Sequence, residues 1–302
     1  GVLVFEHIKV ITLAEALKRY IDDKVQPPSV RVSLSRVLQQ YPLPAVTSVV
    51  EENYTDIDYS ASYYEQRGRA FTPSDKTTTR LHFFSKPFTK AALVGAGRRT
   101  IQSLQRAYLG YTVVRPGVPA TLGRTFLRCP ETVDSYPARF PTRRQVQVDL
   151  VGIPLSVESC PYVSQDERIM ACATAAIWMS AFALAGKVSG VSEHTTAEIT
   201  ALALSLNRPY GPVIGRRGLQ IGEMEHAFLS MGFDPQLWTF PAPSELRDVC
   251  HIYVDSGIPP ILVLESEGVG HAVTVVGFTL APRSKSGEIG NAGIFRASQL
   301  VP

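Results

Sequence analysis

The chain has 302 residues, of which 45% are hydrophobic and 19% are charged, and its formal net charge at pH 7 is +3. This length suggests two domains, and the composition allows a hydrophobic core of normal size without disulfides or metals to support it. A net charge this small argues against a nucleic acid or a membrane surface as a partner.

The sequence shows no sign of export or of membrane insertion. No apolar run approaches the length of a membrane span, and the first residues lack a charged leader followed by an apolar core. The four cysteines form no Cys-x-x-Cys pair and no cluster with zinc-ligand spacing. We therefore expect a cytoplasmic protein with reduced thiols, no metal and no other cofactor.

Residues 1–145 are predicted to form a mixed α/β domain, whose role the sequence does not indicate. A capping box, Thr12-Leu-Ala-Glu15, predicts the start of a helix that ends near Asp23. A weaker helix is expected over 33–40, followed by strands over 46–54 and 79–84, a helix over 98–108, and strands over 111–114 and 121–127. The proline-rich segment 130–141 is the predicted boundary.

Residues 146–302 are predicted to form a second domain, with helices at its front and strands at its back. A capping box at Thr195-Thr-Ala-Glu198 predicts one helix start, and Gly232 and Gly257 predict two helix ends. The expected elements are an alternating strand over 145–155, helices over 172–185, 195–206, 221–231 and 244–256, and strands over 260–264 and 272–278.

One thiol and one imidazole stand where nucleophilic catalysis would need them. Cys172 opens a small, apolar helix, where unpaired backbone N–H groups and the helix dipole favour a thiolate. His271 opens an apolar strand about a hundred residues later, and Gln165 lies in the loop before the cysteine. These residues predict a nucleophile (Cys172), a base (His271) and a donor to the oxyanion (Gln165), the last assisted by the backbone N–H of Cys172.

Each of these residues also has a structural interpretation. A cysteine at a tight helix contact is often an inert buried thiol, and a histidine beside glycines can simply satisfy a turn. The joint occurrence of Cys172, His271 and Gln165 favours the catalytic interpretation.

The stretch from about Tyr162 to Phe278 resembles the papain-like cysteine peptidases, and most closely the bacterial branch of bacteriocin-leader-processing (double-glycine) peptidases. The resemblance lies in a Tyr-x-x-Gln loop, a Cys-Ala-Thr-Ala-Ala helix, a Met-Gly-Phe helix end, the Ser-Gly-Ile-Pro-Pro-Ile-Leu-Val segment and a Gly-His-Ala-Val-Thr-Val-Val-Gly-Phe strand. It implies an α+β fold in which a helix bearing the cysteine packs on an antiparallel sheet bearing the histidine. It also assigns the three roles above to Cys172, His271 and Gln165.

The sequence departs from this family at two places. Gln165 and Cys172 are seven positions apart, which is wider than the family's loop. The family also places an Asp or Asn after the histidine to orient its ring. No Asp follows His271, so the expected orienting residue is either Asn291 or a residue beyond the end of this chain.

The resemblance implies cleavage of a peptide or isopeptide bond in a peptide or protein substrate, through an acyl-enzyme on Cys172. One alternative is acyl transfer to an amine or thiol acceptor, as in phytochelatin-synthase-like members of the same fold. Another is a binding or sensing module with a degenerate site. The sequence does not indicate the oligomeric state.

A second candidate site is the acidic segment that contains Glu51, Glu52, Asp56 and Asp58. Four carboxylates this close together could hold a hard cation. We favour an exposed acidic strand end and turn, without a metal. Trp178, two turns into the Cys172 helix, is expected to lie in the core.

Overall fold

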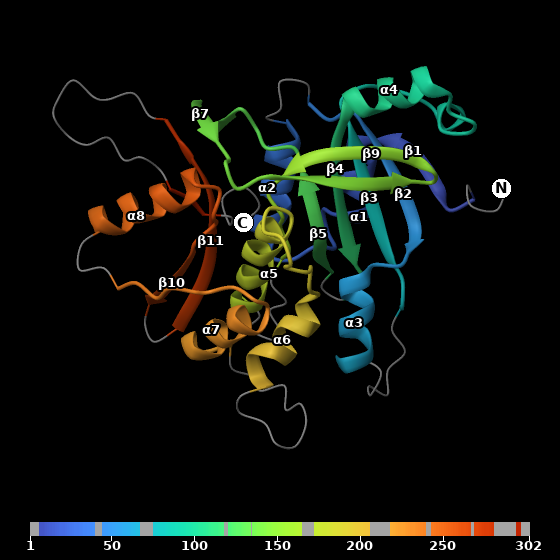
Figure 1. The fold of residues 1–302 in the computed structure, drawn as a ribbon. Coiled ribbons are helices and arrows are strands. Elements are labelled where there is room, and N and C mark those ends of the chain that lie inside the picture. The colour runs from blue at the N-terminus through green and yellow to red at the C-terminus, as the bar shows by residue number, and fades with distance from the viewer. Residues whose placement is uncertain are drawn as a thin grey trace. The chain divides into compact units, whose positions relative to one another are not determined.

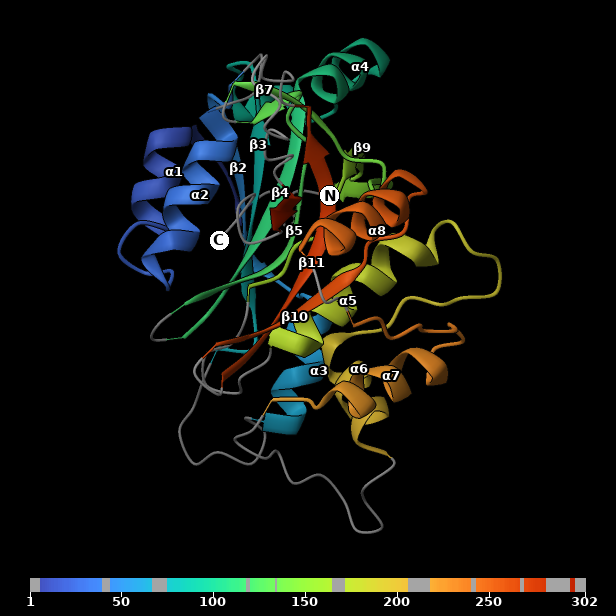
Figure 2. The ribbon, with the colours of Figure 1, turned by 90° about the vertical axis from the view of Figure 1, so that its left-hand side faces the viewer.

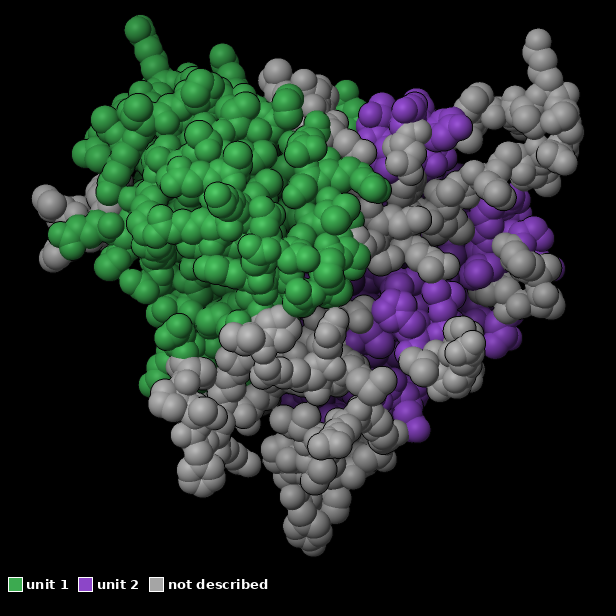
Figure 3. All heavy atoms as spheres, turned by 180° about the vertical axis from the view of Figure 1, so that it is seen from behind, with its two compact units in different colours: residues 1–131, 144–163, 301–302 green, residues 132–143, 164–300 purple. Residues whose placement is uncertain are grey.

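The computed structural model of the chain describes residues 6–39, 44–66, 75–117, 120–133, 135–164, 172–205, 218–239, 243–266, 269–280 and 294–296. The protein is α+β, built from helices and antiparallel sheets (Figure 1). Its chain forms two compact units, coloured separately in Figure 3. Unit 1 comprises residues 1–131, 144–163 and 301–302, and unit 2 comprises residues 132–143 and 164–300.

The two units divide the chain differently from the predicted boundary after residue 145, because segment 132–143 belongs to unit 2 and segment 144–163 belongs to unit 1. Segment 132–143 contains the short strands β6 (Thr132–Val133) and β7 (Tyr136–Arg139), and β7 pairs with a strand of unit 2. Segment 144–163 contains a hairpin that belongs to unit 1. The proline-rich stretch is therefore structured in part, because its backbone groups find partners in a sheet.

Unit 1 is centred on a five-stranded antiparallel sheet with the strand order β1-β2-β3-β4-β5. The strands are β1 (Ile8–Thr12), β2 (Thr47–Tyr54), β3 (Thr78–Phe84), β4 (Tyr108–Arg115) and β5 (Thr121–Leu127). Because successive side chains of a strand point to opposite faces, Val50 and Leu81 face one side while Glu51 and Arg80 face the other. The sheet thus has one apolar and one charged face.

Helices α1 (Leu13–Tyr20) and α2 (Pro28–Gln39) cover the apolar face, as Figure 2 shows. Their buried residues, among them Leu17 and Leu34, join Val50, Leu81 and Phe83 in one hydrophobic cluster. The predicted capping box is present in part, since the Thr12 side chain accepts a hydrogen bond from the Glu15 backbone N–H. Helix α2 begins five residues before the predicted start, because a proline is well tolerated in the first turn of a helix.

The charged face of the sheet carries further elements of unit 1. They are α3 (Ile57–Gln66), α4 (Arg98–Ala107) and a hairpin of β8 (Arg144–Leu150) and β9 (Ile153–Ser159). The Gln105 amide of α4 donates to the Ser156 carbonyl (2.9 Å) and accepts from the Ser156 N–H (2.8 Å), so both backbone groups of this β9 residue have a hydrogen-bond partner. Neither β1 nor α3 was predicted from the sequence.

The single strand predicted over 145–155 is wrong, because the chain reverses in its middle. Val151 and Gly152 both have positive φ values, 50° and 85°, in the two-residue turn between β8 and β9. The Asp149 carboxylate accepts a hydrogen bond from the Gly152 N–H at 2.9 Å. The turn lacked a sequence signal because Val, a β-branched residue, rarely adopts positive φ.

The described part of unit 2 contains four helices and a second antiparallel sheet. The helices are α5 (Cys172–Ala185), α6 (Thr196–Leu204), α7 (Ile221–Ser230) and α8 (Pro243–Asp255). The sheet has the order β10-β11-β7-β6, with β12 (Ile294–Arg296) also paired to β11. The sheet contains β10 (Ile261–Ser266) and β11 (Val269–Thr279). The bounds of these two strands and of the four helices agree with the predicted bounds to within a few residues.

The predicted helix ends of unit 2 are also confirmed. Thr195 and Glu198 form a reciprocal capping box at the start of α6. Gly232 and Gly257 follow α7 and α8 with φ values of 88° and 79°, the left-handed conformation that glycine adopts without strain. No helix in the described ranges is both long enough and apolar enough to cross a membrane.

The strained turn of the β8–β9 hairpin yields a stability prediction. Val151→Asn should raise the free energy of unfolding by about 1 kcal/mol, because Asn tolerates positive φ and Val does not. Urea unfolding followed by circular dichroism measures the change. Val94→Asn is the control, since Val94 is 56% exposed and has no positive φ. Equal effects of the two substitutions would contradict the explanation.

Candidate functional site

Cys172 is the first residue of α5, as the sequence predicts. The eleven residues that follow it, Ala173 to Ala183, are all buried, and Trp178 is 1% exposed, which confirms its predicted place in the core. Cys172 itself is half-buried. The helix is therefore enclosed along most of its length, while its first residue retains access to solvent.

Hydrogen bonds fix how α5 lies along β11. The Thr274 hydroxyl donates to the Ala176 carbonyl at 3.0 Å, and the Ser180 hydroxyl donates to the Pro259 carbonyl at 2.8 Å. Next to Pro259, the carbonyl of Pro260 accepts from the backbone N–H of Val275 at 2.9 Å. From Ala176 to Ser180, helix α5 therefore runs in the same direction as β11.

This alignment brings the ends that carry Cys172 and His271 to the same side of unit 2. Cys172 precedes Ala176 by one turn, about 6 Å along the helix axis. His271 precedes Thr274 by three residues, about 10 Å along the strand. Both residues therefore lie beyond the Thr274–Ala176 hydrogen bond, in the same direction from it.

His271 lies where β11 passes from exposed to buried. Gly270 is exposed, His271 is half-buried and the next residues are buried. In the β10–β11 pair His271 is opposite Leu264. Within the described part of the chain, no hydrogen bond joins the Cys172 thiol and the His271 ring.

The other predicted members of the site lie outside the described residues. Gln165 precedes α5 in the sequence, and Asn291 lies between β11 and β12 in the sequence. Two further histidines of unit 2 have other roles. His226 on α7 bonds the Ser205 hydroxyl (2.9 Å), and the ring of His251 on α8 lies 4.5 Å from that of Phe278.

The acidic segment of unit 1 is not an exposed strand end, and this prediction is wrong. Glu51, Asp56 and Asp58 are buried, with exposed fractions of 9%, 1% and 0%. Asp56 accepts from the Tyr59 N–H at 2.8 Å and so caps the start of α3, while Asp58 forms an ion pair with Arg124. The alternative, a cation site, is not supported either, because no group of three or more potential ligands occurs among the described residues.

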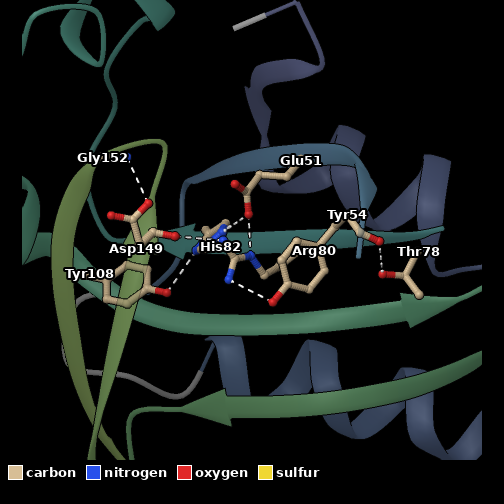
Figure 4. Close-up of polar contacts among 8 residues, drawn as sticks. All are labelled: Glu51, Tyr54, Thr78, Arg80, His82, Tyr108, Asp149 and Gly152. Carbon is tan, nitrogen blue, oxygen red and sulfur yellow. Dashed lines mark hydrogen bonds and ion pairs between the residues drawn. The ribbon is translucent and has the colours of Figure 1, made fainter. Parts of the chain in front are cut away.

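Glu51 is the centre of a buried cluster on the charged face of the sheet (Figure 4). Its Oε2 atom forms an ion pair with the Arg80 guanidinium and lies 2.8 Å from His82 Nε2. Arg80 also donates to the Asp149 carbonyl (2.8 Å), and its guanidinium carbon lies 4.1 Å from the centre of the Tyr54 ring. The cluster thereby joins β2 and β3 to the β8–β9 hairpin.

The hydrogen bonds of the cluster define the protonation of His82. An ionised carboxylate only accepts, so His82 Nε2 donates to Glu51. In a neutral ring Nδ1 then accepts from the Tyr108 hydroxyl, 2.9 Å away. Burial lowers the pKa of His82 and raises that of Tyr108, which agrees with this neutral pair.

Glu51 stays ionised although it is buried. Burial alone would raise its pKa, but the hydrogen bonds from His82 and Arg80 and the positive charge of Arg80 outweigh this and lower the pKa. Every charge of the cluster is thus neutralised within unit 1, and its arrangement serves to hold the sheet and the hairpin together. The sequence signal was a pair of basic residues, Arg80 and His82, in alternate positions of a strand that ends in apolar residues.

Comparisons of the chain with protein-family models, with curated proteins and with solved structures found no match. The papain-like resemblance therefore stays a prediction, carried by the motifs around Cys172 and His271.

Acid should weaken unit 1 through the Glu51 cluster. The pKa values of Glu51 and His82 are both lowered in the folded chain, so the unfolded chain binds these protons more readily. Stability should therefore fall as the pH drops below about 6.5, where unfolded His82 takes up its proton, and again below about 4.5, where unfolded Glu51 does. Urea unfolding at a series of pH values measures this.

Glu51→Gln tests the assignment. It should cost roughly 3–5 kcal/mol at pH 7, because it leaves Arg80 buried without its counter-charge, and it should reduce the loss of stability below about pH 4.5. Asp248→Asn breaks an ion pair with Arg247 whose Asp side chain is 67% exposed, and should cost no more than about 1 kcal/mol. An unchanged acid profile in Glu51→Gln would refute the role of this carboxylate.

Proposed function

We propose that the chain is a thiol-dependent hydrolase that cleaves a peptide or isopeptide bond, with Cys172 as nucleophile and His271 as base. One observation carries the proposal: the helix that begins with Cys172 is hydrogen-bonded to the strand that carries His271 and to Pro259, just before the neighbouring strand, and this alignment brings both residues to the same end. Catalysis by a thiol needs such a pair, held by rigid elements.

The proposed reaction has two steps. The Cys172 sulfur attacks the substrate carbonyl carbon, and the amine leaves with a proton from His271, which gives a thioester on Cys172. His271 then takes a proton from water, the hydroxide attacks the thioester, and the carboxylic acid product leaves as the thiol is restored. The backbone N–H of Cys172 and the Gln165 amide would stabilise the oxyanion of each step.

The fold that we propose for unit 2 is papain-like. A helix bearing the cysteine packs on an antiparallel strand bearing the histidine, which supports this proposal, although fold alone does not imply function. We propose peptides or proteins as substrates and the cytoplasm as the location, where a reducing environment would keep Cys172 reduced. Unit 1 has no proposed activity.

Two features bear on whether Cys172 and His271 could catalyse this reaction. The structure contains no hydrogen bond between Cys172 and His271 in its described part, but catalytic hydrogen bonds are often long in a resting enzyme and tighten when substrate binds. We propose that Asn291 orients the His271 ring, so that the ring can take a proton from water in the second step. The missing contact also favours a second candidate, a binding module with a degenerate site.

Alkylation separates the hydrolase from the binding module. Cys172 should react with iodoacetamide about ten-fold or more faster than Cys250, because a half-buried thiol at a helix start, beside the proposed imidazole base, is a better nucleophile than a buried thiol. Mass spectrometry of the labelled peptides measures each rate. Cys250 serves as internal control, since it is buried and burial raises its pKa.

Two variants make the test specific. His271→Ala should reduce the rate at Cys172 to that of an ordinary thiol, whereas His226→Ala, on an exposed face of α7, should leave it unchanged. If Cys172 is slow in the native chain, the hydrolase proposal fails and the binding module is favoured. If it is fast, product formation with and without an added amine or thiol distinguishes hydrolysis from acyl transfer.

A further inference from the structure

Two cysteines of unit 1 lie in contact, although they are 31 positions apart in the sequence. The sulfur atoms of Cys129 and Cys160 are 3.6 Å apart, and both residues are half-buried. We propose that they form a redox-sensitive pair, which an oxidised low-molecular-weight thiol such as glutathione disulfide converts into an intrachain disulfide. This inference concerns unit 1 and is independent of the proposed function.

The backbone around the pair is already held in place. Arg128 pairs with Ser159 in an antiparallel bridge, immediately before each cysteine. Thr125 and Tyr162 exchange backbone hydrogen bonds of 2.9 and 3.0 Å, which continue the same register. In this register Cys160 is opposite Leu127, so Cys129 is its diagonal neighbour on the same face.

Little movement separates this contact from a covalent bond. A disulfide requires the sulfur atoms to approach to about 2.05 Å, so they must close by about 1.5 Å. Rotation of the two half-buried side chains about their χ1 bonds can provide part of this, and a small shift of the strand ends must provide the rest, because diagonal neighbours in an antiparallel ladder lie about 7–8 Å apart and a disulfide needs Cα atoms within about 7 Å. The other two cysteines belong to unit 2, and no sulfur contact involving them is present in the described part.

The proposed exchange is balanced without a metal or an enzyme. The thiolate of one cysteine attacks a sulfur atom of glutathione disulfide, which forms a mixed disulfide and releases one glutathione thiolate. The second cysteine, after losing its proton, attacks the protein sulfur of that mixed disulfide and releases the second glutathione. Both cysteines are oxidised, one glutathione disulfide is reduced to two thiols, and the two protons from the protein end on those thiols.

The position of the pair gives the disulfide a structural effect. The chain leaves unit 1 between residues 131 and 132 and again between 163 and 164, a few residues after Cys129 and Cys160 respectively. The disulfide would close a loop that contains the β8–β9 hairpin and the segment 132–143, and so fasten together the two strand ends from which the chain departs. Such a loop restricts the unfolded chain, so the oxidised protein should unfold at a higher temperature.

The test incubates the full chain with glutathione disulfide, unfolds it in urea at acid pH to stop exchange, traps the remaining thiols with N-ethylmaleimide in urea and maps the peptides by mass spectrometry. We expect a cross-linked peptide pair containing Cys129 and Cys160, lighter by two hydrogen atoms than the two reduced peptides together, with Cys250 still alkylated. Reduction by dithiothreitol should reverse the change. Full alkylation of Cys129 and Cys160 after this treatment overturns the proposal, and so does glutathione that stays attached to either residue in the native chain.

Single substitutions provide the matched controls. Cys129→Ser and Cys160→Ser should each abolish the cross-link and leave a glutathione adduct on the remaining cysteine, because no partner resolves it. The rise in unfolding temperature on oxidation should disappear in both variants and persist in Cys250→Ser. A rise that survives in Cys129→Ser would overturn the assignment of the effect to this pair.

Discussion

Unit 2 depends on the enclosure of α5. A helix that is apolar on all sides must be covered on all sides, and here β11, α6 and α7 pack against it. Two hydroxyl groups, on Thr274 and Ser180, fix its position along the sheet because their bonds to carbonyls form only in one register. The first residue of an element held this firmly has a defined place, and that residue is the half-buried Cys172.

Unit 1 is organised by a different constraint, the burial of charge. One face of its sheet is apolar, and the other holds Glu51, Arg80 and His82 in mutual contact. Removing such groups from water is costly, so they contribute less to net stability than to the choice of one register between β2, β3 and the β8–β9 hairpin. A slip of one residue would turn the charged side chains into the apolar cluster against α1 and α2.

The sequence predicts elements whose signals are local and misses features that depend on distant partners. Capping residues such as Thr195, and glycines such as Gly232, marked the helix ends because each acts within a few residues. The burial of Asp58 could not be predicted, since its partner Arg124 is 66 positions away. The turn at Val151 was missed because valine rarely adopts the positive φ that it has there. The positions of Cys172 and His271 followed from local motifs, whereas the alignment of α5 with β11 required the structure.

Disulfide trapping tests most directly whether α5 and β11 bring position 172 to position 271. In a chain with Cys129→Ser, Cys160→Ser and Cys250→Ser, the substitution His271→Cys leaves two thiols. Mild oxidation should join these two thiols within one chain. His251→Cys, placed on α8 beside Phe278, seven positions along β11 from residue 271, should leave Cys172 unlinked. No cross-link with His271→Cys, or equal cross-linking in both chains, would show that α5 and β11 do not bring positions 172 and 271 together.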